Sequence, residues 1–478
     1  MSKYSPQTYA TIGLALLLSG CMAMGPDYQR PSLDLPASWP ATAGASLSLA
    51  DKERWWTISS DPFDLEVDRL VKVAFANNND LVLASARVAE AEALLGVARS
   101  DQAPSIYGSA SSDRNRSSEK SAFAQPGIPL KTTSHRAALN FSYEIDFWGK
   151  YQRASEAARA ELLATEAARD TVRIALGCQV ATTYFNLIAL DQRLNTTIRA
   201  EKRAKESLAL QQKRFEAGVA SSFEYQQRVA EYESVRAQIP VIERERDMTE
   251  RALAVLLGHS PREILAPKIE REAIAKTSNM PTLVPPGLPS SLLLRRPDLR
   301  EAEQRLIASN ARIGVARAAY FPSISLTGLF GGESASLSDL FSGPARIWRF
   351  AADLTQPIWG SNRIPFQIDA VEARNQQALA HYRSAIANAF REVQDAIVSQ
   401  VKARDIREAN QRRVSALEKS FALAKLRYEN GVSSQLDVID SERNLLLAEL
   451  DHIETERQLR IALADIFKAI GGPSISVE

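Results

Sequence analysis

Cysteine is nearly absent from this chain: Cys21 and Cys178 are the only two in 478 residues. If Cys21 is modified as argued below, no disulfide can form within the chain. Cys178 lies in an apolar helical stretch and is expected to be a small core residue. Histidine and methionine are also scarce, at four and five residues, and neither type clusters or has the spacing of metal ligands. We therefore expect no metal site.

Charge of one sign is not in excess either. The formal net charge is +1 and no basic stripe is present, so a nucleic-acid partner is not expected. After the first 21 residues there is no run of 18 apolar residues, so we expect no membrane-spanning helix. A membrane-inserted part would have to consist of β-strands.

Catalytic and nucleotide-binding motifs are missing as well. There is no G-x-G-x-x-G and no Walker A sequence. The S-x-x-K tetrapeptide that begins at Ser117 lies in a polar stretch and lacks its partner motifs. The chain is therefore expected not to be an enzyme, and the energy for its function must come from a partner protein.

The N-terminus reads as a processing segment. An apolar run from Ala10 to Leu18 leads into Leu18-Ser19-Gly20-Cys21, which resembles the lipobox of bacterial lipoproteins. Residues 1–20 would then be a signal peptide, and Cys21 would carry N-acyl and S-diacylglycerol lipid (palmitate among the acyl chains) at the start of a linker over residues 21–61. The alternative is an ordinary secretory signal with a chance cysteine. Met22 after the cysteine favours delivery to the outer membrane.

The rest of the chain contains one long block twice, over residues 62–258 and 298–471, with a linker at 259–297 and a tail at 472–478. The same landmarks recur in the same order in both blocks. They are Leu95–Arg99 and Ile313–Arg317, Pro104–Ile106 and Pro322–Ile324, Phe147–Gly149 and Ile358–Gly360, and Arg214–Val219 and Arg427–Val432. The period is too long for a solenoid, so we expect an internal structural duplication within one fold.

Four short segments alternate between apolar and polar residues, as strands do. They lie at about residues 104–112, 136–147, 322–330 and 346–358. An apolar and a polar face on each strand is typical of a transmembrane barrel, although a two-sided soluble sheet would share the pattern. Polar loops at 113–134 and 331–344 would join the strands at the exterior end. Four strands cannot close a barrel, so the chain would have to oligomerise.

Most of the remainder is predicted to be helix. Two stretches of nearly 70 residues, Tyr151–Ala217 and Ser361–Asn430, are almost free of proline and break at Gly218 and Gly431. Each resumes as a second helix, so each block should end in a helical hairpin with a glycine at its tip. After the second tip, Leu436 and two aspartates lie within about 100° of arc on one helix. From the residues alone, a solvated pair of aspartates near a helix start is the simpler interpretation.

These features together resemble the TolC-like outer-membrane efflux factors, in particular the lipoprotein branch that serves resistance-nodulation-division pumps. The resemblance covers the whole mature chain and rests on the lipobox, on Gly25–Pro31, on Arg295–Leu299 and on the two tip motifs. It implies a mainly α-helical homotrimer, in which a tunnel of helical hairpins crosses the periplasm and a 12-stranded β-barrel, four strands per chain, crosses the outer membrane.

The resemblance also implies a site at the hairpin tips. Leu436 matches an apolar constriction, and Asp437 and Asp440 match an aspartate ring, together a periplasmic gate. Glu224 and Tyr428 match residues that tie the hairpins together in the closed state. The tips would dock a periplasmic adaptor protein through small residues, which are Gly218, Val219, Ser221, Gly431, Val432 and Ser433. Ser433 stands where the family prototype has an arginine, so a salt bridge of that lock is missing.

The expected function is therefore passive export of small molecules, such as drugs or other toxic compounds, from the periplasm to the exterior. The implied partners are two further copies of the chain, a periplasmic adaptor, a proton-driven inner-membrane pump and outer-membrane lipid, in a pathway of antibiotic resistance. Two alternatives remain at this point: the duct of a type I protein-secretion system, and a non-conducting structural lipoprotein. The sequence does not identify the cargo.

Overall fold

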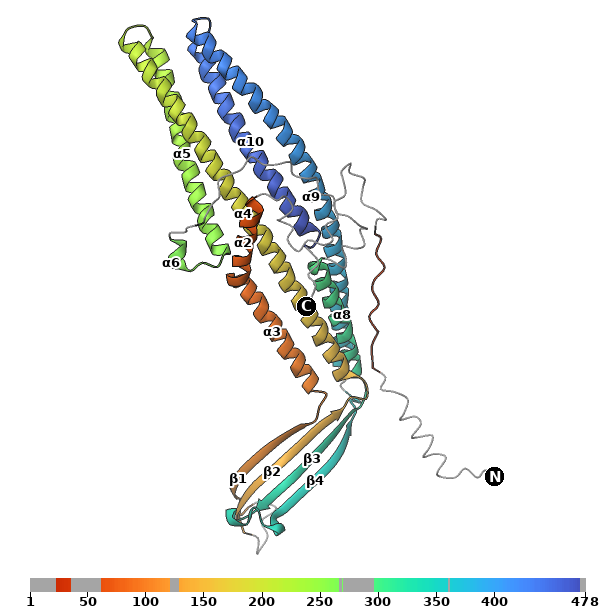
Figure 1. Cartoon of the computed structure of the whole chain (residues 1–478). Helices are drawn as coiled ribbons and strands as arrows, with labels where there is room; N and C mark the ends of the chain where they lie inside the picture. The colour runs from red at the N-terminus through yellow and green to blue at the C-terminus, as the bar shows by residue number, and fades with distance from the viewer. Residues whose placement is uncertain are drawn as a thin grey trace. The chain divides into compact units, whose positions relative to one another are not determined.

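The computed structural model describes residues 23–35, 62–120, 129–265, 269, 296–359 and 362–472. The predicted signal peptide, Cys21, most of the 259–297 linker and nearly all of the C-terminal tail lie outside the described residues. By internal contacts the chain forms two units, one of residues 1–32, 87–165 and 301–382 and the other of residues 33–86, 166–300 and 383–478. Figure 1 shows that the first unit holds all four strands and the second holds the hairpin tips.

The elements repeat with matching lengths. Helices α3 (Asn79–Ser100) and α8 (Pro297–Ala318) have 22 residues each, and strands β1 (Ser105–Arg116) and β3 (Ser323–Ser334) have 12 each. The long helices α4 (Lys150–Glu216) and α9 (Arg363–Glu429) have 67 residues each. Helices α5 (Ser222–Leu256) and α10 (Gln435–Ala469) have 35 residues each. The internal duplication predicted from the sequence is therefore confirmed.

The remaining elements are not paired in length. Strand β2 (Lys131–Ile145) has 15 residues and β4 (Arg346–Thr355) has 10. Helix α2 (Pro62–Asn77) precedes α3, and the short α6 (Pro261–Ile264) follows α5. The connection between β3 and β4 contains two 3-10 turns, η3 (Leu337–Asp339) and η4 (Gly343–Ala345).

The four strands form one antiparallel sheet in the order β1-β2-β3-β4. The predicted strands are found, but β1 and β2 reach further into the predicted loop 113–134 than expected, because their pairing continues from Asp113 opposite Ser134 to Arg116 opposite Lys131. Strand β3 likewise continues to Ser334. Polar residues without an apolar alternation can still form a hydrogen-bonded ladder, and this is why the sequence pattern missed these ends.

The sheet has one apolar and one polar face. The faces are assigned from the register, because directly opposed residues of neighbouring strands lie on the same face. Leu139 is opposite Gly108 and Phe330, and Phe330 is opposite Trp348. This set defines the apolar face, whose larger members are Ile106, Leu139, Phe141, Tyr143, Ile145, Ile324, Leu326, Phe330, Trp348, Phe350 and Leu354. The other face carries Asn140, Ser142, Glu144 and their neighbours and is mostly polar.

The second unit has a continuous apolar core contributed by α2, α4, α5, α9 and α10. Val71, Tyr184 and Leu253 are almost fully buried in it. Cys178 is also buried there, with its thiol 3.6 Å from the carbonyl oxygen of Ala464, and burial raises its pKa to about 12, so that it stays protonated. Helix α4 contains one stretch long and apolar enough to span a membrane, but more than half of that stretch is buried within the protein.

Both hairpins turn at their tips in the same way. Gly218 and Gly431 have φ values of +71° and +73°, a backbone conformation that favours glycine. The amide of Val219 donates to the carbonyl of Arg214 (2.8 Å), and that of Val432 donates to Arg427 (2.9 Å). This is the Schellman pattern, and it satisfies carbonyl groups that the end of a helix would otherwise leave free. The predicted glycine-tipped hairpins are confirmed.

The tip conformation leads to a prediction with a matched control. Gly218→Ala should destabilise the protein by about 1 kcal/mol, because a side chain is unfavourable at positive φ even where space is open. Gly96→Ala, in the interior of α3 with no atom near its Cβ position, should stabilise the protein by up to about 1 kcal/mol. Thermal unfolding of the purified variants measures both. Equal shifts in one direction would contradict the interpretation.

Candidate functional site

The first turns of α5 and α10, just after the tips, are built by capping boxes. The Ser221 hydroxyl accepts a hydrogen bond from the Glu224 amide, and the Glu224 carboxylate accepts one from the Ser221 amide (2.8 Å). Ser434 and Asp437 make the same reciprocal pair at the start of α10, with the Ser434 amide donating to Asp437 at 3.0 Å. Asp437, a predicted gate residue, and Glu224, a predicted tie residue, therefore also stabilise the first turns of their helices.

The predicted gate residues lie together on the first turns of α10. Leu436 is 48% exposed. A surface helix of an isolated soluble protein would usually carry a polar residue at such an exposed position. Asp437 is exposed and Asp440 is half-buried. Asp440 accepts a hydrogen bond from Arg443, one turn further along the helix, at 2.8 Å. This arginine was not predicted from the sequence, although an arginine three residues after an aspartate is a recognisable pairing pattern on a helix.

The two predicted tie residues have other partners within the chain. Glu224 closes its capping box, and the Tyr428 hydroxyl on α9 accepts a hydrogen bond from Arg214 on α4 at 2.6 Å. The Arg214 guanidinium also lies 5.3 Å from the centre of the Tyr428 ring. This contact joins the first hairpin to the second. Arg214 belongs to the repeated tip motif, so the motif carries a contact between hairpins as well as a turn.

The residues predicted to dock an adaptor form open ends. Val219 is 78% and Val432 is 66% exposed, and no atom lies within 4 Å of a Cβ placed on Gly218 or Gly431. Ser221 is exposed, whereas Ser433 is half-buried with no hydrogen-bond partner among the described residues for its buried hydroxyl. Phe223, which was not among the predicted docking residues, is 71% exposed at the start of α5. The first tip is thus more apolar than small residues alone would make it.

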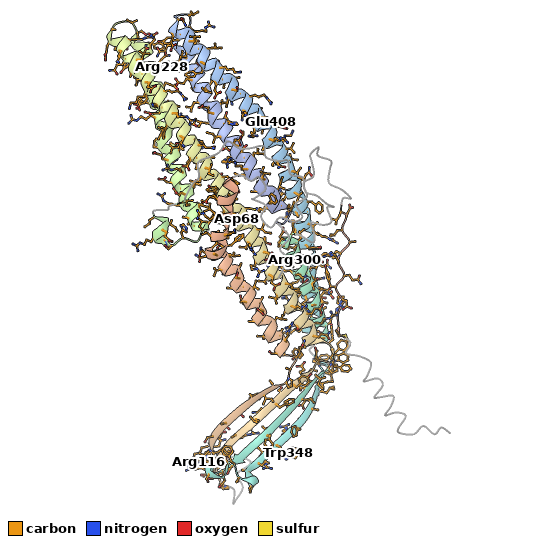
Figure 2. All side chains as sticks on the ribbon, in the orientation of Figure 1. Asp68, Arg116, Arg228, Arg300, Trp348 and Glu408 are labelled. Atoms are coloured by element: carbon orange, nitrogen blue, oxygen red, sulfur yellow. The ribbon has the colours of Figure 1, made fainter. Side chains whose placement is uncertain are left out.

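A buried cluster of charges lies below the tips. The Glu442 carboxylate on α10 is 3.6 Å from Arg203 on α4 and 3.6 Å from Arg228 on α5, and Arg228 is only 4% exposed. Figure 2 labels Arg228 near the tip end of the helices. Burial raises the pKa of Glu442 and lowers that of Arg228, in both cases against the attraction between them. This cluster lies between the two hairpins, and no periodic pattern in the sequence predicts it.

The two motifs that carried the resemblance make long-range contacts. In the first unit, Arg30 forms a two-pronged ion pair with the buried Glu303 on α8, which also accepts a hydrogen bond from Tyr28. Gly25, at φ +93°, lies against Gly314 of the same helix. In the second unit, Arg296 is buried and donates to Ala469, Asp298 and Glu392. Residues 25–30 are therefore fixed to the folded chain.

The comparisons with known proteins agree with this geometry. The family model of outer membrane efflux proteins matches residues 70–259 and 288–472. The cation efflux system protein CusC of Escherichia coli O6:H1 is 32% identical over 98% of this chain and 99% of its own. A probable outer membrane lipoprotein of Salmonella typhimurium, SilC, is 30% identical over 97% of this chain and 98% of its own.

Solved structures give the same result. The crystal structure of the CmeC outer membrane channel of Campylobacter jejuni superposes with a TM-score of 0.88 at 27% identity, covering 95% of this chain and 96% of that one. The chain belongs to the outer membrane efflux protein family. Its members are channels of tripartite efflux systems rather than enzymes, and those of known structure are homotrimers.

The predicted fold class, function and location are thereby confirmed. The chain has the fold of the trimeric channels, in which long helical hairpins form a tunnel and the strands form a β-barrel. It is an outer-membrane efflux channel that extends into the periplasm. None of the described residues form a group of three or more histidine, cysteine or acidic side chains able to hold a metal ion.

The buried charge cluster predicts a pH dependence. Because burial holds the pKa of Glu442 above its ordinary value, the folded state favours the protonated carboxyl. The stability that this gives is fully present below the ordinary pKa of glutamate and is lost as the pH rises through the raised value. Glu442→Gln imitates the protonated form. It should unfold at a higher temperature than the wild type at about pH 8, and the difference should vanish towards about pH 4.

The control is Glu233→Gln, which removes an exposed ion pair with Arg236 on the same helix as Arg228. Such pairs contribute less than about 1 kcal/mol, so this variant should follow the wild type at every pH. If Glu442→Gln were instead less stable at about pH 8, the two arginines would outweigh burial, and the assignment of the raised pKa would be wrong.

Proposed function

We propose that the channel is closed in its resting state at the first turns of α10, by Leu436, Asp437 and Asp440. The observation that carries this proposal is an exposed leucine beside two carboxylates at the open end of a hairpin. In a trimer, three copies of this surface around one axis would place an apolar ring next to as many as six carboxylates. Such a ring repels anions and binds cations, so the closed end would be cation-selective and blocked by multivalent cations.

A second part of the proposal concerns the partners. The exposed ends Val219, Phe223 and Val432 offer an apolar surface that would be covered by the hairpin tips of a periplasmic adaptor. Through that adaptor the channel would be coupled to a proton-driven pump in the inner membrane. This agrees with the absence of any nucleotide-binding motif, which leaves the energy of transport to a partner.

A third part concerns the membrane anchor. We infer that Cys21 is acylated after signal cleavage, because the lipobox precedes it and because a relative matched over nearly its full length is named as a lipoprotein. The Tyr28 hydrogen bond and the Arg30 ion pair to Glu303 lie only a few residues later. They would hold the lipidated end against the folded chain rather than on a free tether.

The cargo is proposed to be small toxic molecules. CusC is named as a cation efflux protein, and metal cations are therefore one class to test alongside drugs. The type I protein-secretion alternative loses support, because the family match and the relatives' names point to efflux. The non-conducting lipoprotein is set aside, because the family consists of channels.

The gate assignment predicts an electrical phenotype. In planar bilayers the wild type should show small, cation-selective openings that divalent and trivalent cations block. Asp437→Ala/Asp440→Ala should lose at least about tenfold in sensitivity to block, because the binding carboxylates are gone. The control is Asp395→Ala, an exposed aspartate of α9 paired with Arg391. Unchanged block in the double variant would refute the gate.

The ties between hairpins predict a separate effect. Tyr428→Phe removes the hydroxyl that accepts from Arg214, and Glu224→Gln weakens the cap of α5 without truncating its side chain. The double variant should raise the basal conductance, because the tips would be less firmly held. A matched control is Phe215→Leu, next to Arg214 but stacked on Tyr225 within the first hairpin. A double variant with wild-type conductance would remove these residues from the gate.

A further inference from the structure

The apolar face of the sheet ends in a band of positive charge. Cross-strand pairing places Arg114 and Arg116 of β1, Lys131 of β2 and Arg346 of β4 on that face, since Arg116 is opposite Lys131, and Arg346 is opposite Gly332. His135, opposite Ser112 and Ser334, lies between them. All of these residues lie at the end of the strands where the β1–β2 and β3–β4 connections are made. We call them the basic band.

The basic band has no matching acid on its own face. Within the four strands, which are fully described, no aspartate or glutamate lies on the apolar face. Asp113, Glu144, Glu333 and Asp353 all lie on the opposite face, where they mix with Arg136 and Arg349. Arg116 pairs with Glu119, a residue beyond the strand, at 3.2 Å. Arg114, Lys131 and Arg346 have no ion-pair partner among the described residues.

The basic band lies beyond the end of the apolar surface, where the lipid headgroups of a membrane would be. On β3 the apolar face runs from Ile324 to Gly332, eight steps along the chain, which is roughly 26 Å along the strand. Because strands of a membrane barrel are tilted by about 35–45°, this length gives a height of about 20 Å, which lies within the lipid-facing zone of about 25 Å. The helices join the strands at the opposite end from the connections. With the helices in the periplasm, the basic band therefore lies at the exterior surface of the outer membrane.

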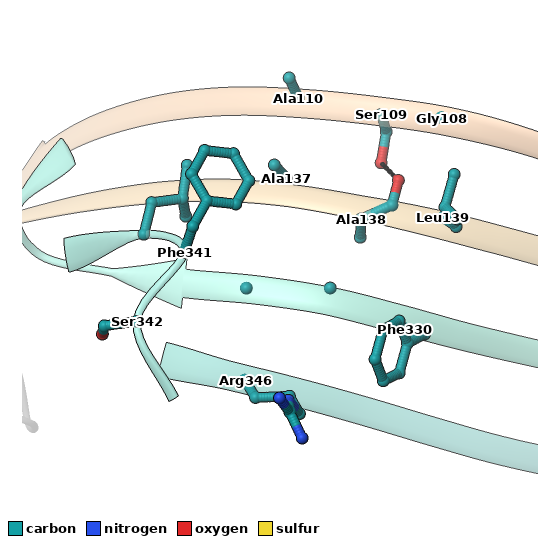
Figure 3. Close-up of a pocket in the computed structure, with 13 residues that line it drawn as sticks. Gly108, Ser109, Ala110, Ala137, Ala138, Leu139, Phe330, Phe341, Ser342 and Arg346 are labelled. Atoms are coloured by element: carbon teal, nitrogen blue, oxygen red, sulfur yellow. Dashed lines mark hydrogen bonds between the residues drawn. The ribbon is translucent and has the colours of Figure 1, made fainter. Parts of the chain in front are cut away.

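A groove opens at the boundary between the apolar surface and the band. Its volume is about 600 Å³, and its floor consists of small residues such as Gly108, Ala137 and Gly332. The segment between η3 and η4 forms one wall, with the Phe341 side chain, and Arg346 stands at the rim (Figure 3). Figure 2 places Trp348 and Arg116 on the same sheet. Phe341 is 86% exposed, an unfavourable position in water for a phenyl ring.

We propose that the basic band and the groove together bind the lipid A part of lipopolysaccharide in the exterior leaflet. The cations would hold the two phosphates of its glucosamine headgroup, and the groove would take an acyl chain beside Phe341. Arginine suits this role because its guanidinium donates two parallel hydrogen bonds to a phosphate. A lipid with two phosphates on one headgroup matches several cations spread across one face of the sheet better than a glycerophospholipid with one. The inference rests on the outer-membrane orientation of the channel.

The test uses the detergent-solubilised full-length trimer and native mass spectrometry. The wild type is titrated with bisphosphorylated lipid A, with dephosphorylated lipid A and with phosphatidylglycerol. It should bind the first most tightly. Arg114→Gln/Lys131→Gln/Arg346→Gln should bind bisphosphorylated lipid A about a hundredfold more weakly, since each basic residue near an anionic lipid layer contributes about fivefold and three are removed. Phe341→Ala should weaken binding several-fold without changing the preference for phosphates.

The matched control is Arg136→Gln/Arg349→Gln, which removes cations from the opposite face of the same strands. This variant should bind lipid A as the wild type does. Equal loss in both variants, or equal binding of lipid A and phosphatidylglycerol by the wild type, would overturn the proposal. Conductance in planar bilayers separates this result from a failure of the channel itself, because the triple variant should still conduct and be blocked by cations.

Discussion

Unsatisfied backbone groups at the two edges of the sheet are the constraint on which the rest of the structure depends. β1 and β4 each have a neighbour on only one side, so one edge of each strand has no partner among the residues that the structure describes. In hydrocarbon every such group costs several kcal/mol. The apolar face can therefore enter a membrane only when other copies complete the ladder on both sides. Association of several copies and closure of the barrel both follow from this one requirement.

Folding and gating use the same residues at the hairpin tips. Asp437 caps α10 and Glu224 caps α5, while both lie where the channel is proposed to close. A change at either position therefore alters helix stability and conduction together. The Arg203–Glu442–Arg228 cluster differs, because it is buried between the hairpins and caps no helix. Its charges are poorly compensated, and this gives a junction that is specific in geometry and only weakly stabilising.

The sequence predicted the features that depend on local patterns. The duplication, the glycine tips and the alternating strands are all local or periodic, and the structure confirms them. The polar extensions of β1 and β2 were missed because Ser, Asn and Thr show no alternation there. Contacts such as Arg214 with Tyr428 were missed for another reason. They depend on how two helices, more than 200 residues apart in the sequence, are rotated against each other. The periodicity of either helix alone does not contain that information.

The equal lengths of the two long helices have a mechanical consequence. A single inserted residue would raise the tip of α4 by about 1.5 Å and rotate it by about 100°, so Arg203 and Arg214 would no longer face the second hairpin. About seven inserted residues, roughly two helical turns, would restore the original direction of the side chains. A tunnel built from such hairpins can therefore be lengthened only by insertions of that size, made in α4, α5, α9 and α10 together. The length of the tunnel can thus change only in discrete steps, and a partner that binds its end has a fixed distance to match.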